Sequence, residues 1–300
     1  MLSSVRAAIR SNTQAGRPVF STPVVVESLE PVSASFVRVS VRGQSLEYAE
    51  PWPADGFRLA LPADGRGSLS LPAPDEDGQV SWPPAQQPTT RGLTVRRYDA
   101  AERRICFDVV THPGLTYRWL QNARPGDHVA IIGIRREFYA AAGVDHHLIV
   151  GDTSALPAIA SILDGLAEDL PATATAIVTA EDDSDLALLS PRGKQELTGL
   201  CAHGAEQVSA ALLGALRELR RPQGRVQAWV AGETTFVRQA RRVLLKQWQL
   251  PREDVQASAY WTLGHDSDQS EAKLIKQYES AIANGLDLTD PDVADELAFG

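Results

Sequence analysis

Residues 91–99 read RGLTVRRYD, and apolar and polar side chains alternate in the middle of this stretch. In an extended strand, the side chains at positions i and i+2 lie on the same face. Arg91 and Leu93 are therefore expected on one face, and Thr94 and Arg96 on the other. Such alternation is typical of a strand that buries one face and exposes the other. The stretch predicts a half-buried β-strand with positive charge on both faces.

Other short strands flank this one on both sides. Apolar and polar residues alternate in residues 35–42 and 57–62, whereas Pro, Gly and Asp are frequent between 62 and 90 and predict a long loop there. Short strands joined by turns, with one helix-like insert near 116–123, are typical of a small antiparallel barrel. The strands expected in this six-stranded antiparallel barrel are residues 23–28, 35–42, 57–62, 93–98, 104–111 and 126–132.

The pattern changes near residue 145. Apolar strand-like segments then alternate with segments whose apolar residues recur at helical spacing. This alternation predicts a parallel sheet covered by helices. We expect a barrel domain at residues 1–145 and an α/β domain at 146–300 that ends in an acidic tail. The expected strands are residues 147–150, 174–180, 226–231 and 255–260, and the expected helices are 156–168, 205–220 and 234–248.

Composition narrows the functional classes. The chain has 300 residues, a net charge of −9 and 43% hydrophobic residues, which suits a folded protein and argues against nucleic-acid binding. Its two cysteines, Cys106 and Cys201, have no metal-binding spacing, so neither a disulfide nor an iron–sulfur cluster is expected. No apolar run approaches the ~20 residues of a membrane span, and no signal peptide is visible. We expect a cytoplasmic protein without a membrane partner.

Further segments follow residues 91–99 in a fixed order. Taken together with that strand, they resemble the siderophore-interacting proteins, which are FAD-dependent ferric-siderophore reductases related to ferredoxin reductases. The resemblance extends roughly from residue 20 to residue 265. It is carried by HPGLTYRW at 112–119, GD at 126–127, GDTSALPAI at 151–159, WVAGE at 229–233 and YWTLG at 260–264.

The resemblance implies that the first domain is an FAD-binding barrel. In the family, the strand at 91–96 reads Arg-x-Tyr-Thr/Ser-x-Arg. The resemblance implies that Arg91 contacts the FAD pyrophosphate and that the Thr94 hydroxyl hydrogen-bonds near N5 of the flavin ring. Leu93 stands where the family has the tyrosine that packs on the flavin. A leucine offers neither a phenol nor ring stacking, so this departure is expected to alter FAD affinity or redox potential.

The segment at 112–119 is expected to begin a helix. Free N–H groups at a helix N-terminus suit a phosphate, and the resemblance assigns His112, Thr116 and Tyr117 to FAD. Thr116 is a candidate capping or phosphate-binding hydroxyl, and Tyr117 is bulkier than the family's small residues.

The second domain is implied to bind NAD(P)H against the flavin, because ligands of open α/β sheets bind at the carboxyl ends of the strands. Asp152 and its neighbours end one expected strand, and Gly232 and Trp261 end two others. The cofactor-binding candidates here are Asp152, Thr153, Ser154, Ala155, Gly232, Glu233 and Trp261.

Arg135 and Arg136 are candidates for binding an anionic ferric-siderophore, since guanidinium groups pair well with carboxylate and catecholate oxygens. The family's Gly-Pro-x-Gly turn is incomplete at this position. A solvated arginine pair is the alternative interpretation.

The implied function is electron transfer from NADH or NADPH, or from a reduced carrier, through FAD to a ferric-siderophore, with release of Fe(II). One-electron reduction of Fe(III) needs no nucleophile, acid or base, and none is proposed; nor is a resident metal. Two alternatives stay open: a siderophore-binding or regulatory protein that has lost flavin chemistry, and a flavin-dependent reductase of another pathway. The siderophore, the preferred donor and the oligomeric state are not specified by the sequence.

Overall fold

The computed structural model describes residues 21–46, 51–70, 73–74, 80–81, 88–166 and 172–265, and in the C-terminal part residues 277, 280–281, 283–287, 290 and 293. Most of the predicted acidic tail and much of the loop predicted at 62–90 lie outside the described residues.

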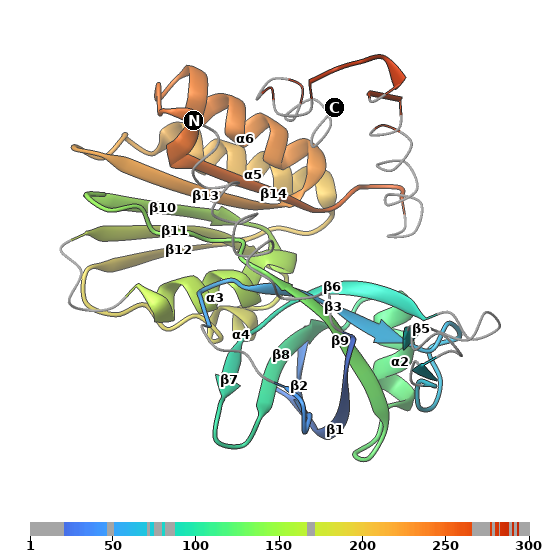
Figure 1. The fold of residues 1–300 in the computed structure, drawn as a ribbon. Coiled ribbons are helices and arrows are strands. Elements are labelled where there is room, and N and C mark those ends of the chain that lie inside the picture. The colour runs from blue at the N-terminus through green and yellow to red at the C-terminus, as the bar shows by residue number, and fades with distance from the viewer. Residues whose placement is uncertain are drawn as a thin grey trace.

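The first half of the chain forms an antiparallel sheet that curls into a barrel (Figure 1). Its strand order is β6-β3-β9-β1-β2-β8-β7, and every pairing within it is antiparallel. Two short strands, β4 (Ala73–Pro74) and β5 (Val80–Ser81), pair separately, and helix α2 spans Leu115–Asn122. The strands of the main sheet are β1 (Ser21–Pro31), β2 (Phe36–Arg42), β3 (Gly56–Leu61), β6 (Thr89–Thr94), β7 (Arg97–Asp99), β8 (Arg104–Val110) and β9 (His128–Arg135).

The predicted barrel is confirmed, but its sheet has seven strands where six were predicted. The additional strand arises because the stretch at 93–98 is not continuous. Val95 N–H donates to the Asp55 carbonyl and Arg96 N–H donates to the Cys106 carbonyl, both at 2.8 Å. The backbone thus changes partner between β6 and β7, passing from the β3 side to β8, and this crossing brings the two ends of the sheet together.

Alternating side chains fill the barrel interior. Val39 and Val41 of β2 meet Ile105 and Phe107 of β8, and all four are fully buried. Trp119 of α2 is fully buried in the same cluster. Apolar burial of this kind is the main force that holds the barrel closed.

The second half forms a parallel sheet of order β12-β11-β10-β13-β14, as predicted. Strand β12 was not predicted, because it is an edge strand with much of its surface exposed and carries no apolar run. The elements are β10 (His146–Gly151), α3 (Leu156–Gly165), β11 (Thr173–Ala180), α4 (Asp183–Leu186), β12 (Gln195–Cys201), α5 (Ala205–Glu218), β13 (Val226–Glu233), α6 (Thr234–Lys246) and β14 (Val255–Trp261), with short 3₁₀ turns at Thr153–Ala155 and Arg252–Asp254.

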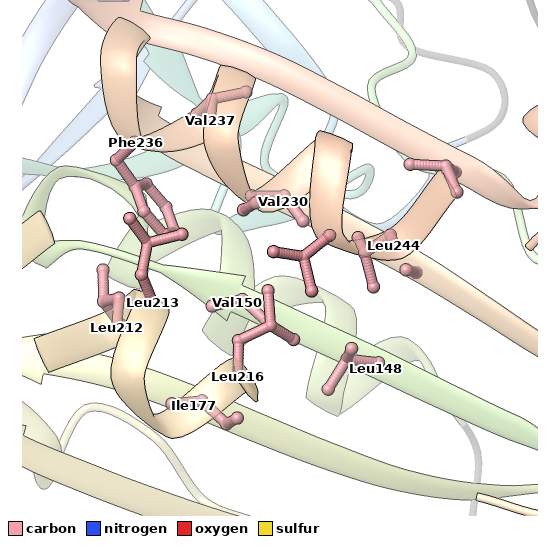
Figure 2. Close-up of a cluster of buried hydrophobic side chains, with 14 of the residues drawn as sticks. Leu148, Val150, Ile177, Leu212, Leu213, Leu216, Val230, Phe236, Val237 and Leu244 are labelled. Atoms are coloured by element: carbon pink, nitrogen blue, oxygen red, sulfur yellow. The ribbon is translucent and has the colours of Figure 1, made fainter. Parts of the chain in front are cut away.

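Helices cover both faces of this sheet. Figure 2 shows the apolar side chains of α5 and α6 meeting those of β10, β11 and β13. Helix α3 packs on the opposite face, where Ile159 and Leu163 are fully buried. The sheet is therefore a rigid platform whose strand ends are held in fixed positions.

Helix α3 also lies between the parallel sheet and the barrel (Figure 1). The Ala54 N–H donates to the Ser161 hydroxyl at 3.1 Å, and Arg96 pairs with Asp164 at 2.5 Å. Asp185, which is fully buried, accepts from the Ser33 hydroxyl at 2.6 Å. Polar contacts as well as apolar packing thus join the two sheets.

In the described part of the chain, no helix is both long and apolar enough to cross a membrane. The same residues contain no group of His, Cys, Asp and Glu side chains arranged to hold a metal ion.

Candidate functional site

The carboxyl ends of β10, β13 and β14 meet around the side chain of Asp152, which is 3% exposed. Its Oδ1 accepts from the Ser154 N–H at 2.9 Å and from the Ser154 hydroxyl at 2.5 Å. Its Oδ2 accepts from the Glu233 N–H at 2.8 Å and from Trp261 Nε1 at 2.9 Å. Burial raises the pKa of Asp152, and these hydrogen bonds oppose the rise. The Asp152 carboxylate thus links the ends of β10, β13 and β14 through hydrogen bonds.

Gly232 is required by that carboxylate. Its φ is 144°, a conformation that side chains other than glycine rarely adopt, and a Cβ at this position would lie 2.4 Å from Oδ2 of Asp152. The glycine predicted from the motif thus serves the Asp152 contact.

Glu233 caps helix α6. Its Oε2 accepts from the N–H groups of Thr235 at 2.6 Å and Phe236 at 3.0 Å, and its Oε1 accepts from the Leu263 N–H at 3.3 Å. An acid is favoured at this position, because the helix dipole favours negative charge at the N-terminus. Glu233 also ties the segment after β14 to the start of α6.

The rest of the motif at 151–155 forms a tight turn. Thr153 donates its hydroxyl proton to the Thr179 carbonyl at 3.3 Å. Ala155 is fully buried, and a Cβ on Gly151 would lie 2.7 Å from its methyl group. The polar groups of this motif are therefore largely engaged within the protein, while Trp261, at 37% exposed, presents a ring to solvent.

Strand β6 forms the wall of the barrel. Leu93 pairs with Phe57 and packs against the barrel core, whereas Thr94 pairs with Gly56 on the other face. The predicted division of faces is confirmed for these two residues. Arg91 is half-buried, and its Nη1 donates to the Thr90 carbonyl at 2.8 Å.

Gly92 leaves open space on this wall. Its Cβ position has no described atom within 4 Å, so the backbone can be approached closely. A flat ligand could therefore lie against β6 beside the guanidinium of Arg91.

Helix α2 begins without a side-chain cap. Gly114 is its N-cap residue, no described side chain caps it, and its first turn contains no acidic residue. Thr116 therefore does not cap the helix, because it lies inside the first turn; Thr116 and Tyr117 are both half-buried there. His112 is exposed, and its Nδ1 lies 3.1 Å from the Pro113 carbonyl.

These features fit FAD. An uncapped helix N-terminus offers N–H groups and a positive dipole end to a pyrophosphate. Arg91 adds a cation, and the open Gly92 surface gives room for a ring.

Arg135 and Arg136 have separate partners. Arg135 forms an ion pair with Glu137, and the guanidinium of Arg136 lies over the Trp52 ring, 4.1 Å from its centroid. Trp52 in turn stacks on Tyr139. The positive charge of Arg135 is thus compensated by a neighbour, while Arg136 is held on an aromatic surface.

Two further residues of the site stand in motifs that carry the resemblance, WVAGE and YWTLG, but were not among the predicted cofactor-binding residues. Tyr260 donates its hydroxyl proton to Oε2 of Glu137 at 3.0 Å, although 123 positions separate them. Trp229 Nε1 donates to the Glu137 carbonyl at 3.1 Å. Their place in the two motifs was the signal in the sequence, but it did not reveal that both contact Glu137.

Two family models match this architecture. The siderophore-interacting FAD-binding domain matches residues 25–138, and the siderophore-interacting protein model matches residues 144–264. The chain belongs to the siderophore-interacting protein family. The two matches coincide with the barrel and with the parallel sheet.

Family members from several bacteria are similar over most of their length. Ferric vibriobactin reductase ViuB of Vibrio cholerae is 29% identical over 245 residues, which cover 79% of this chain and 88% of ViuB. The NADPH-dependent ferric-chelate reductase of Escherichia coli is 27% identical over 250 residues, covering 79% of this chain and 91% of that enzyme. A crystal structure of a siderophore utilization protein from T. fusca superposes with a TM-score of 0.71 at 29% identity, covering 83% of this chain and 95% of that one.

Proposed function

We propose that this protein is an FAD-dependent ferric-siderophore reductase that takes electrons from NADH or NADPH and releases Fe(II). The proposal rests on one observation: the features suited to FAD lie within the residues that match the family's FAD-binding domain. The span that matches the family's FAD-binding domain, 25–138, contains both the open wall of β6 and the uncapped start of α2. The names of the relatives, which are reductases of ferric vibriobactin and of ferric chelates, support the substrate class.

On the barrel side, Arg91 and the start of α2 hold the FAD pyrophosphate, with His112, Thr116 and Tyr117 around it. Thr94 faces the flavin ring, and Leu93 supports the strand from the core side. When bound, FAD supplies the redox chemistry, since it accepts an electron pair and can release single electrons. The chain itself binds and orients the cofactor.

On the sheet side, the strand ends around Asp152 form the nicotinamide face. Asp152 and Glu233 act through the backbone and side chains that they fix, because their carboxylate oxygens are engaged within the protein. The surface offered to the nucleotide comprises Thr153, Ser154 and the ring of Trp261, and the buried Ala155 and Gly232 shape the backbone beneath it.

We propose that Arg135 and Arg136 bind the anionic ferric-siderophore. Arg136 is the stronger candidate, because its charge is not paired with a carboxylate in the described part of the chain. We further propose that residues 1–145 and 146–300 are two domains, and that the reductase works in the cytoplasm.

The first test is an absorption spectrum of the purified protein after incubation with FAD and removal of the excess. Flavin bands should remain with the protein, and anaerobic NADH or NADPH should bleach them. Adding a ferric-siderophore with a colorimetric Fe(II) chelator should then restore the bands and yield two Fe(II) per NAD(P)H oxidised.

Each failure has a distinct meaning. A folded protein that takes up no FAD would refute the proposal, and tight siderophore binding by that protein would favour a binding or regulatory role. Reduction of free flavin or quinones without reduction of any ferric chelate would indicate a reductase of another pathway.

A further inference from the structure

Residues 136–145 join the two halves of the chain and lie along the face of the parallel sheet. This connecting segment follows β9 and leads into β10. Side chains of β13, and one just before it, reach the segment from alternate positions, because alternate side chains of a strand point to the same face. The contacts are Arg225 Nη1 donating to the Ala142 carbonyl at 2.7 Å, Gln227 Oε1 accepting from the Ala141 N–H at 3.1 Å, and Trp229 Nε1 donating to the Glu137 carbonyl at 3.1 Å.

Gln256 of β14 holds the middle of the connecting segment. Its Nε2 donates to the Tyr139 carbonyl at 2.7 Å, and its Oε1 accepts from the Tyr139 N–H at 3.0 Å. A primary amide has both donors and an acceptor, so one side chain satisfies both backbone groups of Tyr139. Gln256 is 8% exposed and Gln227 is 1% exposed. Hydrogen bonds shielded from water in this way are costly to leave unmade.

Tyr260 is an extra residue in the sheet. Strand β14 pairs in register with β13 up to Ala259, which faces Gly232, but Trp261 faces Glu233. One more residue is therefore present on β14 than on β13 at this point, and that residue is Tyr260. Such bulges are uncommon between parallel strands, and they redirect a side chain away from its regular position. The redirected side chain of Tyr260 reaches the connecting segment.

Both ends of the connecting segment are anchored as well. At its start, the Tyr260 hydroxyl donates to Oε2 of Glu137 at 3.0 Å, and Phe138 is 2% exposed in the apolar cluster that includes α3. At its end, Oδ2 of Asp145 accepts from the Arg225 N–H at 2.8 Å. The segment therefore differs from the exposed linkers with few contacts that allow domains to move as hinges.

We propose that Gln227 and Gln256 are positioning residues of the reductase, which hold the connecting segment so that the barrel wall and the sheet edge keep a preset spacing. The inference rests on the proposed function, in which FAD lies on the barrel wall and the nucleotide lies on the sheet edge. Two groups at a fixed spacing need no domain closure before they react, and a small displacement slows a reaction strongly. The nucleotide therefore enters a site that is already assembled.

The first test is amide hydrogen exchange of the full-length protein. In the wild type, the N–H groups of Tyr139 and Ala141 should exchange as slowly as those of the neighbouring strands, because the two glutamine oxygens protect them. Gln256→Met should speed exchange at Tyr139, and Gln227→Met should speed it at Ala141, each by about tenfold, the size of one hydrogen bond. Gln239→Met changes an exposed glutamine of α6 and is the matched control, with unchanged exchange at both sites.

The second test measures reduction of the FAD-loaded protein by NADH or NADPH under anaerobic conditions. At saturating nucleotide, the rate in the Gln227→Met/Gln256→Met double variant should fall about tenfold, while the FAD affinity and the half-saturating nucleotide concentration stay within twofold. The long-wavelength absorbance of a nicotinamide stacked on a flavin should weaken in the same variant, which a loss of stability alone would not cause. The wild-type rate should not depend on solvent viscosity, because no domain closure precedes it.

Unchanged exchange in the variants would show that the two glutamines do not hold the segment, and it would overturn the inference. Faster exchange with an unchanged rate and absorbance would also overturn it, because the segment would then be structural only. A wild-type rate that falls in proportion to viscosity would mean that domain closure is needed. If the double variant fails to fold, as judged by thermal unfolding, the single variants and the viscosity series decide. A wild-type protein that takes up no FAD would remove the proposed function and the positioning role, whereas the exchange result would still stand for the segment.

Discussion

The carboxyl edge of the parallel sheet and the wall of the barrel differ in how fully they satisfy their own polar groups. At the sheet edge, Asp152 accepts four hydrogen bonds and Glu233 accepts three. At the barrel wall, the start of α2 has no side-chain cap among the described residues, and the backbone at Gly92 faces open space.

This difference indicates that the sheet edge supports the structure and that the barrel wall binds the cofactor. A buried carboxylate with every oxygen engaged has little left to offer a ligand, but it fixes the backbone around it. An uncapped helix end retains N–H groups that need a partner. The sheet edge is therefore expected to respond to mutation through stability, and the barrel wall through cofactor affinity.

The largest expected effect is at the sheet edge. Gly232→Ala would place a methyl group against Oδ2 of Asp152 and impose an unfavourable φ, which should lower the free energy of unfolding by about 3 kcal/mol. Urea denaturation measures it. Gly92→Ala on the barrel wall, where the Cβ meets no described atom within 4 Å, is the matched control and should cost less than ~1 kcal/mol. Equal losses would break the distinction between the two regions.

The second effect is a pH dependence inside the parallel sheet. His147 of β10 is 3% exposed, and burial lowers its pKa from 6.5 to about 4. The unfolded chain takes up a proton as the pH falls below 6.5, but the folded protein does so only near pH 4. The stability associated with neutral His147 is thus present above pH 6.5 and is lost on acidification, up to ~3 kcal/mol.

Urea denaturation at pH 7 and pH 4.5 measures this loss. His147→Leu should flatten the dependence, whereas His203→Gln, at an exposed position, should leave it as in the wild type. An equally steep dependence in His147→Leu would assign the proton uptake to another group.

At the barrel wall, Arg91→Ala should weaken FAD binding about tenfold to one-hundredfold, the size of a charge-assisted hydrogen bond to phosphate. Fluorescence titration measures the affinity, and the free energy of unfolding should change little. Arg42→Ala removes an exposed arginine of β2 and should alter FAD affinity less than twofold. A loss of stability without a loss of affinity would place Arg91 with the supporting residues.

The smallest effect concerns Leu93. Leu93→Tyr should leave FAD affinity nearly unchanged, because the side chain at this position packs against the barrel core and not on the face of Thr94. Leu93→Met, which keeps an apolar chain of similar volume, should do the same. Tighter binding in Leu93→Tyr by about fivefold, the size of roughly 1 kcal/mol of aromatic stacking, would mean that the side chain at this position reaches the flavin.

Local patterns predicted both halves of the fold. Alternation at residues 35–42 and strand–helix alternation after residue 145 correspond to β2 and to the parallel sheet. Strand β12 escaped prediction because an exposed edge strand needs no apolar run. Strand β7 was predicted as part of one strand with β6. The two strands are separate because the backbone changes its hydrogen-bond partner after Thr94, from Asp55 to Cys106, and no local pattern reveals this change.

The site was predictable in its parts but not in its connections. Asp152, Glu233 and Trp261 were singled out from separate motifs, and the structure joins them. The contact of Tyr260 with Glu137 could not be foreseen, because it spans 123 positions and depends on a bulge between β13 and β14. Pairings of this kind arise from register, which a single sequence does not display.

The bulge at Tyr260 also constrains how this fold can be recombined. In a hybrid protein that takes β13 from one family member and β14 from another, β14 must keep its one extra residue relative to β13. A match in amino-acid composition is not enough. A β14 shorter by one residue would bring Tyr260 into register and turn Trp261 to the opposite face of the sheet, away from Asp152. The two strands, with the helix between them, therefore form the smallest unit that can be exchanged intact.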